Sequence, residues 1–352
     1  MAIKLPAKAK VVVVGGGVIG CSVAYHLTKL GWSDVLLLEK EQLTSGTTWH
    51  AAGLIVSGLL DNETSADIFT YSRNLYSTLE EETGLATGFK SIGYLQIACD
   101  TERLEEMRRS AAFMRNFGID CHEIGLEEAR SHWPNAKWDD VIGAFYTAED
   151  GRANPVDVTM SLAKGFRQRG GTLVEGVRVT DVLEQQGQVT AVVTDHGTVE
   201  TQFVVNCAGM WARQFGELAG VSLPLQAAEH YYLITEDMPG MTPTTPVLED
   251  PDRYAYFREE VGGMMIGLFE PEAAPWNLDR IPDDFSFGEI DPDWERMIPF
   301  LESAYERVPE AKNLGIRKFF CGPESFTPDL APLVGEAPEL RNYFVACGMN
   351  SL

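Results

Sequence analysis

Three glycines and one glutamate near the start of the chain have the residue types and spacing of a dinucleotide-binding site. Gly15, Gly17 and Gly20 form a G-x-G-x-x-G pattern, and Glu39 follows 19 residues after Gly20. In such a pattern the first glycine permits a tight turn, the second lets the backbone approach a pyrophosphate, and the third lets a helix pack closely on a strand. The carboxylate accepts hydrogen bonds from a ribose 2′-hydroxyl and would repel a 2′-phosphate. The pattern therefore predicts FAD or NAD, and not NADP, as the ligand.

The flanking residues are typical of the strand, helix and second strand that such a site requires. Residues 11–14 and 35–38 are wholly apolar, which indicates strands buried on both faces. Residues 21–30 place apolar side chains at helical spacing, and Gly31 is a typical helix end. A helix that starts after the glycines offers free N–H groups to phosphates. A glycine-rich turn alone can be merely structural, but the complete unit that ends at Glu39 favours a nucleotide site.

The later segments predict a cofactor domain that is interrupted by a second, sheet-rich domain. Residues 203–209 are typical of a buried strand that ends in a small-residue turn. Residues 223–269 alternate in a way that predicts an antiparallel sheet, and residues 276–308 are predicted to be helical with proline breaks. A last strand is expected at residues 343–347. The predicted fold class is α/β with two domains: a Rossmann-like cofactor domain and a mixed antiparallel-sheet substrate domain.

Composition and charge narrow the class of protein. The 352 residues carry a formal net charge of −24, which argues against nucleic acid or an anionic membrane as a partner. No apolar run approaches the roughly 18 residues of a membrane span. The six cysteines form no C-x-x-C pair, so we expect reduced thiols and no metal site. Because the first strand is expected to start near residue 10, we also expect no leader peptide and a cytoplasmic location.

Three longer motifs carry a resemblance to a known family. They are T-S-G-T-T-W-H-A-A-G at residues 44–53, C-G-P-E-S-F-T-P-D at residues 321–329 and G-E-A-P-E-L at residues 335–340. With these motifs the chain resembles flavoproteins of the glycine/D-amino-acid oxidase family along its whole length. Within that family it is most similar to the FAD-binding half of sarcosine dehydrogenase and dimethylglycine dehydrogenase.

The resemblance implies FAD as the cofactor, and it assigns domains and contacts to this chain. The FAD-binding domain is expected to be discontinuous, with the substrate-binding domain in its gaps: residues 1–90, 145–225 and 320–352 for the former, residues 91–144 and 226–319 for the latter. The residues expected to contact FAD belong to the glycine loop, the end of the second strand, the 44–53 motif and the later returning segments: Gly15, Gly17, Val18, Ile19, Gly20, Glu39, Lys40, Ser45, Gly46, Thr47, Thr48, His50, Ala52, Gly53, Leu54, Val179, Ala208, Gly209 and Trp211.

His50 has the most specific of these predicted roles. In the family the matching histidine is bonded through a ring nitrogen to the 8α-methyl group of the flavin, so the resemblance implies a covalent bond at His50. Such a bond holds the cofactor and tends to raise the flavin potential, which helps the flavin to take a hydride from an unactivated N-methyl group. From the residue alone, a polar side chain hydrogen-bonded in a tight loop is the alternative interpretation.

His230, Tyr256 and Arg258 are the candidate catalytic residues. His230 opens an alternating run, and Tyr254, Tyr256 and Arg258 share one face of a predicted strand. His230 and Tyr256 match substrate-facing positions of dimethylglycine-oxidising relatives. A neutral imidazole at His230 would take the amine proton or orient its lone pair, and Tyr256 would hydrogen-bond the substrate carboxylate or His230. For Arg258, a bidentate pair with the carboxylate and an exposed salt bridge are both open.

The resemblance implies an FAD-dependent oxidoreductase that oxidises the N-methyl group of a sarcosine- or dimethylglycine-type amino acid. A hydride would pass from the N-methyl carbon to flavin N5, and hydrolysis of the iminium would give formaldehyde and the demethylated amine. An electron-transfer flavoprotein or oxygen would reoxidise the flavin. The folate-binding C-terminal half of such relatives has no counterpart before Leu352, so tetrahydrofolate is not expected as the formaldehyde acceptor.

Other classes of function stand as alternatives. One is a non-catalytic regulatory protein, because the regulatory subunit of pyruvate dehydrogenase phosphatase resembles the same family. That subunit shares the glycine loop and the N-C-A-G turn but lacks the T-W-H motif, so its presence at residues 48–50 favours an enzyme. A second alternative is an inactive fragment. An NAD-dependent dehydrogenase is disfavoured because no second nucleotide site or hydride-relay residues are apparent.

Overall fold

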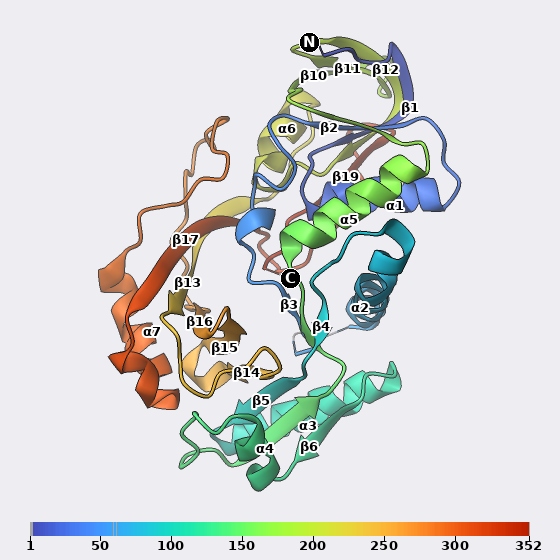
Figure 1. Ribbon diagram of the computed structural model, residues 1–352. Helices are drawn as coiled ribbons and strands as arrows, with labels where there is room; N and C mark the ends of the chain where they lie inside the picture. Colours follow the sequence, from blue (N-terminus) through green and yellow to red (C-terminus); the bar gives the residue numbers. More distant parts are fainter. Residues whose placement is uncertain (1–2, 59, 61, 352) are drawn as a thin grey trace.

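Two large sheets with a small sheet between them organise the chain in the computed structural model, which describes residues 3–58, 60 and 62–351 (Figure 1). Residues 1–2, 59 and 61 of the predicted FAD-binding domain, and residue 352, lie outside this description. The helices are α1 (Val18–Lys29), α2 (Glu63–Thr83), α3 (Thr101–Asn116), α4 (Leu126–His132), α5 (Pro155–Gln168), α6 (Ala212–Leu218) and α7 (Trp294–Arg307). There are also short 3-10 helices: η1 (Thr48–His50), η2 (Gly209–Trp211), η3 (Pro251–Arg253) and η4 (Pro309–Asn313).

The first sheet contains the strand–loop–helix–strand unit that the sequence predicts. Its strands are β1 (Lys8–Val14), β2 (Val35–Glu39), β9 (Thr172–Glu175), β10 (Val179–Glu184), β11 (Val189–Thr194), β12 (Gly197–Asn206), β18 (Leu333–Glu336) and β19 (Tyr343–Cys347). β1 lies between β2 and β12 and runs parallel to both, and β19 is parallel to β12. The hairpin β10–β11 and the strand β18 pair antiparallel at the margins.

Both faces of this sheet are covered, which explains why β1 is apolar at successive positions. Val11 and Val13 pack with Ala24 of α1 and Leu162 of α5 on one face. Val12 points to the other face and belongs to the core that includes Phe215 of α6. The layers are visible in Figure 1, where α1 and α5 lie side by side along the sheet. The predicted cofactor fold is confirmed.

The second sheet is mixed, as predicted. Its strands, in spatial order, are β17 (Ile316–Phe326), β13 (Gln226–Thr235), β16 (Gly263–Leu268), β15 (Ala255–Glu260), β14 (Val247–Asp250), β5 (Tyr94–Ala98), β7 (Gly143–Thr147) and β6 (Cys121–Ile124). β14 and β5 are parallel, and the other neighbours are antiparallel. A large apolar core lies between one face of this sheet and α7. The small sheet consists of β3 (Leu54–Ile55), β8 (Gly151–Arg152) and β4 (Lys90–Ser91).

Two details differ from the sequence-based expectations. The whole of β17 pairs with β13, so residues 320–326 belong to the second sheet, although the last segment of the predicted FAD-binding domain starts at residue 320. Residues 276–308 were expected to be helical, but only α7 within them is an α-helix. Pro282 and Pro292 interrupt the segment before α7. Several backbone groups of this segment form hydrogen bonds with residues of the cofactor domain and not with one another along a helix. We call residues 277–288 the strap.

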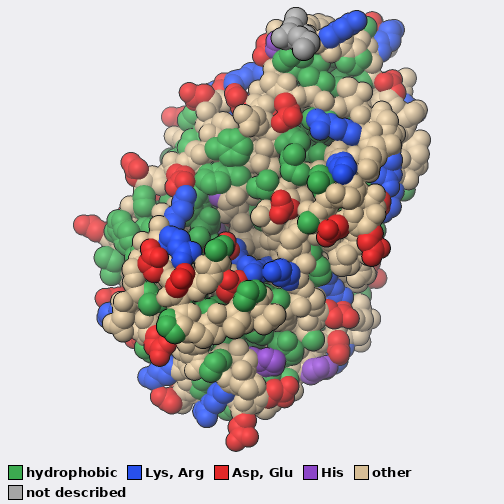
Figure 2. Space-filling model, viewed as in Figure 1, with side chains coloured by type: hydrophobic (Ala, Val, Ile, Leu, Met, Phe, Trp, Pro, Cys, Tyr) green, Lys and Arg blue, Asp and Glu red, His purple; other side chains and the backbone are tan. Residues whose placement is uncertain are grey.

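Charged side chains of both signs lie on the surface. Acidic side chains are spread over the face shown in Figure 2, with basic side chains interspersed. Among the described residues, none of the helices combines the length and the apolar character needed to cross a membrane.

Candidate functional site

The glycine loop after β1 is packed so closely that side chains would not fit. Gly15 has φ +112°, and a Cβ there would lie 2.3 Å from the carbonyl oxygen of Cys207. A Cβ on Gly20 would lie 1.9 Å from the carbonyl oxygen of Gly15. These two glycines therefore let α1 start directly against the loop and against the end of β12. A Cβ on Gly17 would meet the Thr48 hydroxyl at 3.1 Å, so the 44–53 motif lies on this loop.

Glu39 ends β2 beside the glycine loop, as predicted. It is 7% exposed, and its Oε2 accepts a hydrogen bond of 2.6 Å from Gly16 N. Burial raises the pKa of Glu39, and hydrogen bonds from backbone N–H groups oppose that shift. At the start of α1, Val18 N donates to Thr48 Oγ1 at 3.0 Å, and Ile19 continues the first turn. The helix N-terminus and the carboxylate thus lie at the same end of the parallel strands.

Lys40, Gly46 and Trp211 form a second group of predicted cofactor residues. Lys40 Nζ lies 3.5 Å from the centre of the Trp211 ring, and a Cβ on Gly46 would lie 3.3 Å from that ring. Burial lowers the pKa of Lys40 to about 8. Ala208 and Gly209 lead from β12 into η2 and so carry Trp211 to this position.

The strap covers this second group. Lys40 Nζ donates to Asp283 O at 2.7 Å, and Trp211 Nε1 donates to Pro282 O at 2.9 Å. Phe287 N donates to Ser45 O at 2.9 Å. The strap therefore holds Lys40, Trp211 and Ser45, three of the residues that are expected to contact FAD.

Val179 is another residue that is expected to contact FAD. It is the first residue of β10 and is buried in the core on the α6 face.

The rest of the 44–53 motif runs from the glycine loop to the second sheet. Thr47 Oγ1 donates to Pro323 O at 3.3 Å, and Ala52 O accepts from Arg258 Nε at 3.0 Å. Gly53 has φ +70°, and a Cβ there would lie 2.3 Å from Ala153 O. Leu54 then starts β3. The motif thus connects the cofactor side to the strands of the second sheet.

His50 is buried where the motif meets β17. It is 4% exposed, and its Nε2 is a buried atom without a hydrogen-bond partner. Burial lowers the pKa of His50 to about 4, so the imidazole is neutral near pH 7. The ring centres of His50 and Phe320 are 4.8 Å apart, and a Cβ on Gly322 would lie 2.9 Å from His50 Cε1. Among the described residues, this Nε2 makes no hydrogen bond of the kind that the alternative interpretation of His50 expects.

His230 and Tyr256 lie on the face of the second sheet that is opposite to α7. Phe269 connects them, since its ring centre is 5.2 Å from His230 and 5.3 Å from Tyr256. Tyr256 is 2% exposed, and burial raises the pKa of its phenol. Gly267 of β16 pairs with Tyr256 of β15, and a Cβ on Gly267 would lie 1.8 Å from the Tyr256 ring. Tyr254 does not share this face, because it precedes β15 with φ +52° and is 45% exposed.

Arg258 lies on the same strand but is not on the surface. It is 7% exposed, so the alternative of a salt bridge on the exposed surface is wrong. Its Nη1 pairs with Glu260 Oε2 at 2.5 Å, and its Nε bonds the 44–53 motif. For its Nη2, the described residues provide no hydrogen-bond partner. Arg258 therefore fixes the motif and keeps one donor group available.

Sequence reasoning missed three residues of this face: Gly267, Gly322 and Glu324. Glu324 is 8% exposed, and its Oε2 has no hydrogen-bond partner. The 321–329 motif contains both Gly322 and Glu324, and their alternation would have placed them on one strand face. What could not be seen is the register with β13, which sets Gly322 opposite His230.

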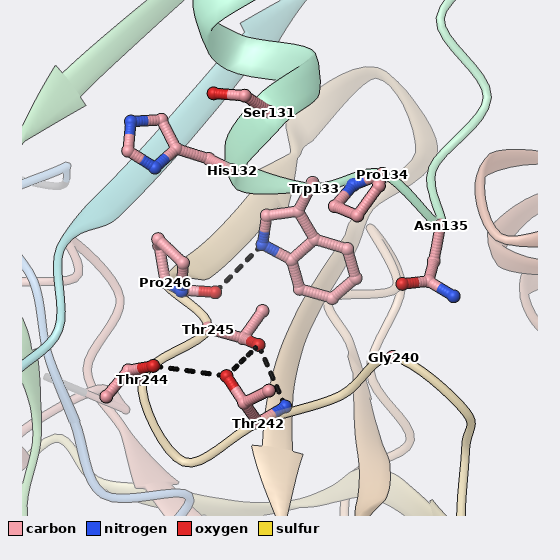
Figure 3. Close-up of a pocket in the computed structure, with 10 residues that line it drawn as sticks. All are labelled: Ser131, His132, Trp133, Pro134, Asn135, Gly240, Thr242, Thr244, Thr245 and Pro246. Carbon is pink, nitrogen blue, oxygen red and sulfur yellow. Dashed lines mark hydrogen bonds between the residues drawn. The ribbon is translucent and has the colours of Figure 1, made fainter.

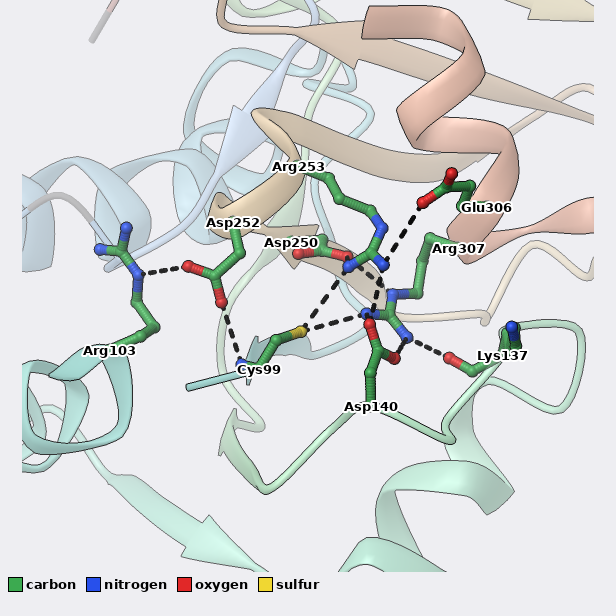
Figure 4. A network of polar contacts seen from close by, with 9 residues as sticks. All are labelled: Cys99, Arg103, Lys137, Asp140, Asp250, Asp252, Arg253, Glu306 and Arg307. Atoms are coloured by element: carbon green, nitrogen blue, oxygen red, sulfur yellow. Dashed lines mark hydrogen bonds and ion pairs between the residues drawn. The ribbon is translucent and has the colours of Figure 1, made fainter. Parts of the chain in front are cut away.

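Two other polar features lie apart from these residues. A cavity of about 260 Å³ is lined by residues 131–135, Gly240, Thr242 and residues 244–246 (Figure 3). Its polar groups largely pair with one another, for example Trp133 Nε1 with Pro246 O at 2.8 Å. The Cys99, Asp250 and Asp252 side chains cluster as metal ligands can (Figure 4). However, the Arg307 guanidinium contacts both Asp250 and Cys99, so an arginine occupies the position that a cation would take.

The donor set and the backbone of the first sheet fit a dinucleotide. The glycines leave backbone exposed where a Cβ would clash, a carboxylate ends the second strand, and the helix N-terminus faces the same edge. His50 Nε2 is an unpaired ring nitrogen on the side of the motif that faces His230 and Tyr256. One end of the site is thus suited to phosphates and the other to a small polar molecule.

Comparisons with known proteins agree with this arrangement. Residues 10–352 match the family described as FAD dependent oxidoreductase, DAO. Human mitochondrial sarcosine dehydrogenase is 41% identical over 99% of this chain and 38% of that protein. The 4-methylaminobutanoate oxidase (formaldehyde-forming) of Paenarthrobacter nicotinovorans is 39% identical over 99% of this chain and 42% of that protein. The chain thus spans about two fifths of the length of these curated relatives.

The crystal structure of L-proline dehydrogenase from P. horikoshii has the same fold. It superimposes with a TM-score of 0.88 at 27% identity, over 99% of this chain and 89% of that chain. The resemblance to the glycine/D-amino-acid oxidase family and the predicted two-domain fold are both confirmed.

Proposed function

Because the chain belongs to the DAO family of FAD-dependent oxidoreductases, we propose that it oxidises the N-methyl group of a small N-methyl amino acid such as sarcosine or dimethylglycine. The observation that carries this proposal is the buried, unpaired Nε2 of His50 on the same side as His230 and Tyr256. The names of two relatives, sarcosine dehydrogenase and a formaldehyde-forming methylaminobutanoate oxidase, support the choice of an N-methyl amine.

The residues that would hold FAD are those of the glycine loop, Glu39 and the 44–53 motif. FAD, when bound, supplies the acceptor for the hydride that leaves the N-methyl carbon. The glycine loop and the N-terminus of α1 would bind the pyrophosphate, and Glu39 would accept hydrogen bonds from the ribose. We further propose that His50 Nε2 forms the covalent link to the flavin. A neutral imidazole has the lone pair that such a bond needs, and the pKa of about 4 keeps His50 neutral.

Substrate handling falls to the second sheet. His230 would take the proton of the amine, because only the unprotonated amine loses hydride readily. Tyr256, a protonated phenol in a buried position, would donate a hydrogen bond to the substrate. The free Nη2 of Arg258 would bind the carboxylate. Hydrolysis of the iminium product would then give formaldehyde, and an electron-transfer flavoprotein or oxygen would accept the electrons.

Acid denaturation of the purified protein tests the cofactor part of the proposal. Flavin absorbance is expected to stay with the precipitated polypeptide and, after digestion, with the peptide that contains His50. His50→Ala should release it, whereas His122→Ala, at a side chain that is 54% exposed, should not. Addition of sarcosine or dimethylglycine to the holoenzyme should bleach the flavin and release formaldehyde. Flavin released intact from the wild type would disprove the covalent bond, and a protein without flavin would favour the non-catalytic alternative.

A further inference from the structure

We propose that Glu324 is the anionic partner of the substrate's protonated amine. This inference rests on the proposed function, and it adds a specificity-determining residue that binds the nitrogen next to the reacting N-methyl carbon.

The strand β17 places Glu324 on the face that contains His50. Residues 320, 322 and 324 alternate with the pleat and therefore point to the same side of the sheet. The Phe320 ring contacts His50, and Gly322 leaves the space that the His50 ring occupies. Glu324 is the next side chain along this line. On β13 it pairs with Ala228.

One oxygen of the Glu324 carboxylate is buried without a partner. The residue is 8% exposed, and its Oε2 has no hydrogen-bond partner among the described residues. A buried, unpaired carboxylate is costly in a folded protein. Such a cost is typical of sites where the missing partner is a ligand. Because the group is an anion, the ligand atom that it suits is a cation or an N–H donor.

The electrostatic effect of the Glu324 carboxylate reaches His50 and Tyr256. Burial lowers the pKa of His50, and the Glu324 carboxylate opposes that shift. Burial raises the pKa of Tyr256, which Arg258 opposes and Glu324 increases. Tyr256 thus lies in the field of a cation and an anion on the same sheet face.

Aromatic rings on the same face suit a methylated amine. Tyr232 and Phe320 stack with their ring centres 4.9 Å apart, and Tyr232 faces the same side of β13 as His230. Methylammonium groups bind to aromatic faces through cation–π attraction. Glu270 also has unpaired buried oxygens, but its Oε1 is 3.7 Å from Arg296 Nη2 on α7. Glu324 is therefore the better candidate for the amine.

The test compares wild-type holoenzyme with Glu324→Gln, which keeps the shape and removes the charge. N-methylglycine is the probe that carries the positively charged amine. Butanoate is its carbon isostere, which has the carboxylate but no positive charge. The dissociation constant of N-methylglycine comes from the concentration dependence of anaerobic flavin reduction, and that of butanoate from the change in flavin absorbance. We expect about 10- to 100-fold weaker N-methylglycine binding in the variant, the range of a lost charge-assisted hydrogen bond. Butanoate should bind equally well or more tightly.

The control is Glu289→Gln, at a carboxylate that is 43% exposed and paired with Lys318. It should bind both probes as the wild type does. Glu324→Gln should also melt at the same or a higher temperature, because it removes an unpaired buried charge. Equal weakening of both probes, unchanged N-methylglycine binding, or a lower melting temperature would overturn the inference. A wild-type flavin that neither N-methylglycine nor N,N-dimethylglycine reduces would instead overturn the proposed function, and the inference with it.

Discussion

At the scale of single residues, Gly322 decides whether His50 can occupy its position. A Cβ at residue 322 would lie 2.6 Å from the Phe320 ring and 2.9 Å from His50 Cε1. Both distances are shorter than real Cβ contacts allow, so one of the two rings would have to move. The backbone itself tolerates alanine, since Gly322 has no positive φ.

Gly322→Ala is therefore expected to displace His50 without breaking β17. We expect the free energy of unfolding to fall by about 1–3 kcal/mol, the usual cost of overpacking a core, and covalent flavin to fall with it. Urea denaturation and acid precipitation measure the two effects. Gly125→Ala is the matched control, because a Cβ there meets nothing within 4 Å. Full flavin attachment in Gly322→Ala would show that the contact does not position His50.

The residues that sequence reasoning could identify are those defined by local spacing. Gly15, Gly20 and Glu39 belong to one continuous unit, so their pattern predicts their neighbours. Gly322 and Glu324 acquire their meaning only from the register of β17 against β13, whose partners lie about a hundred positions earlier in the chain. Such a register depends on tertiary packing, which a local pattern does not encode.

At the scale of elements, the strap shows why residues before α7 are not helical. Ile281 N and Ile281 O both bond the Gln214 side chain, and Phe287 N bonds Ser45 O. A helix would direct these groups along its own axis. The apolar and proline pattern of the sequence predicted breaks, but it could not show that the backbone partners belong to another part of the fold.

Lys40→Met tests how the strap is held. The substitution removes the donor to Asp283 O and the cation above Trp211 while keeping the length of the side chain. Loss of one buried hydrogen bond of this kind costs about 1–2 kcal/mol locally. Amide hydrogen exchange at Ile281 and Phe287 should therefore become about 5- to 30-fold faster. Lys8→Met, at a side chain that is 73% exposed, serves as the control. Unchanged exchange at both amides would mean that the other bonds alone hold the strap.

At the scale of the whole molecule, a few buried polar contacts connect the cofactor side to the second sheet. Arg152 of β8 pairs with Glu259 of β15, with Nη2 and Oε2 2.6 Å apart. Its Nη1 also donates to Glu259 O at 3.0 Å. Glu259 is 3% exposed, so this ion pair is shielded from solvent. Beside it, Arg258 Nε bonds Ala52 O and so attaches the same strand to the 44–53 motif.

Arg152→Leu should therefore weaken the coupling between the two large sheets. It leaves the buried Glu259 carboxylate without its cation, which typically costs about 3–5 kcal/mol. We expect calorimetry to show a lower melting temperature and two separated transitions where the wild type shows one. Adding Glu259→Gln removes the buried charge and should recover part of the lost stability, since the penalty arises from the unpaired carboxylate. A single transition with a loss below about 1 kcal/mol would mean that apolar contacts alone join the two sheets.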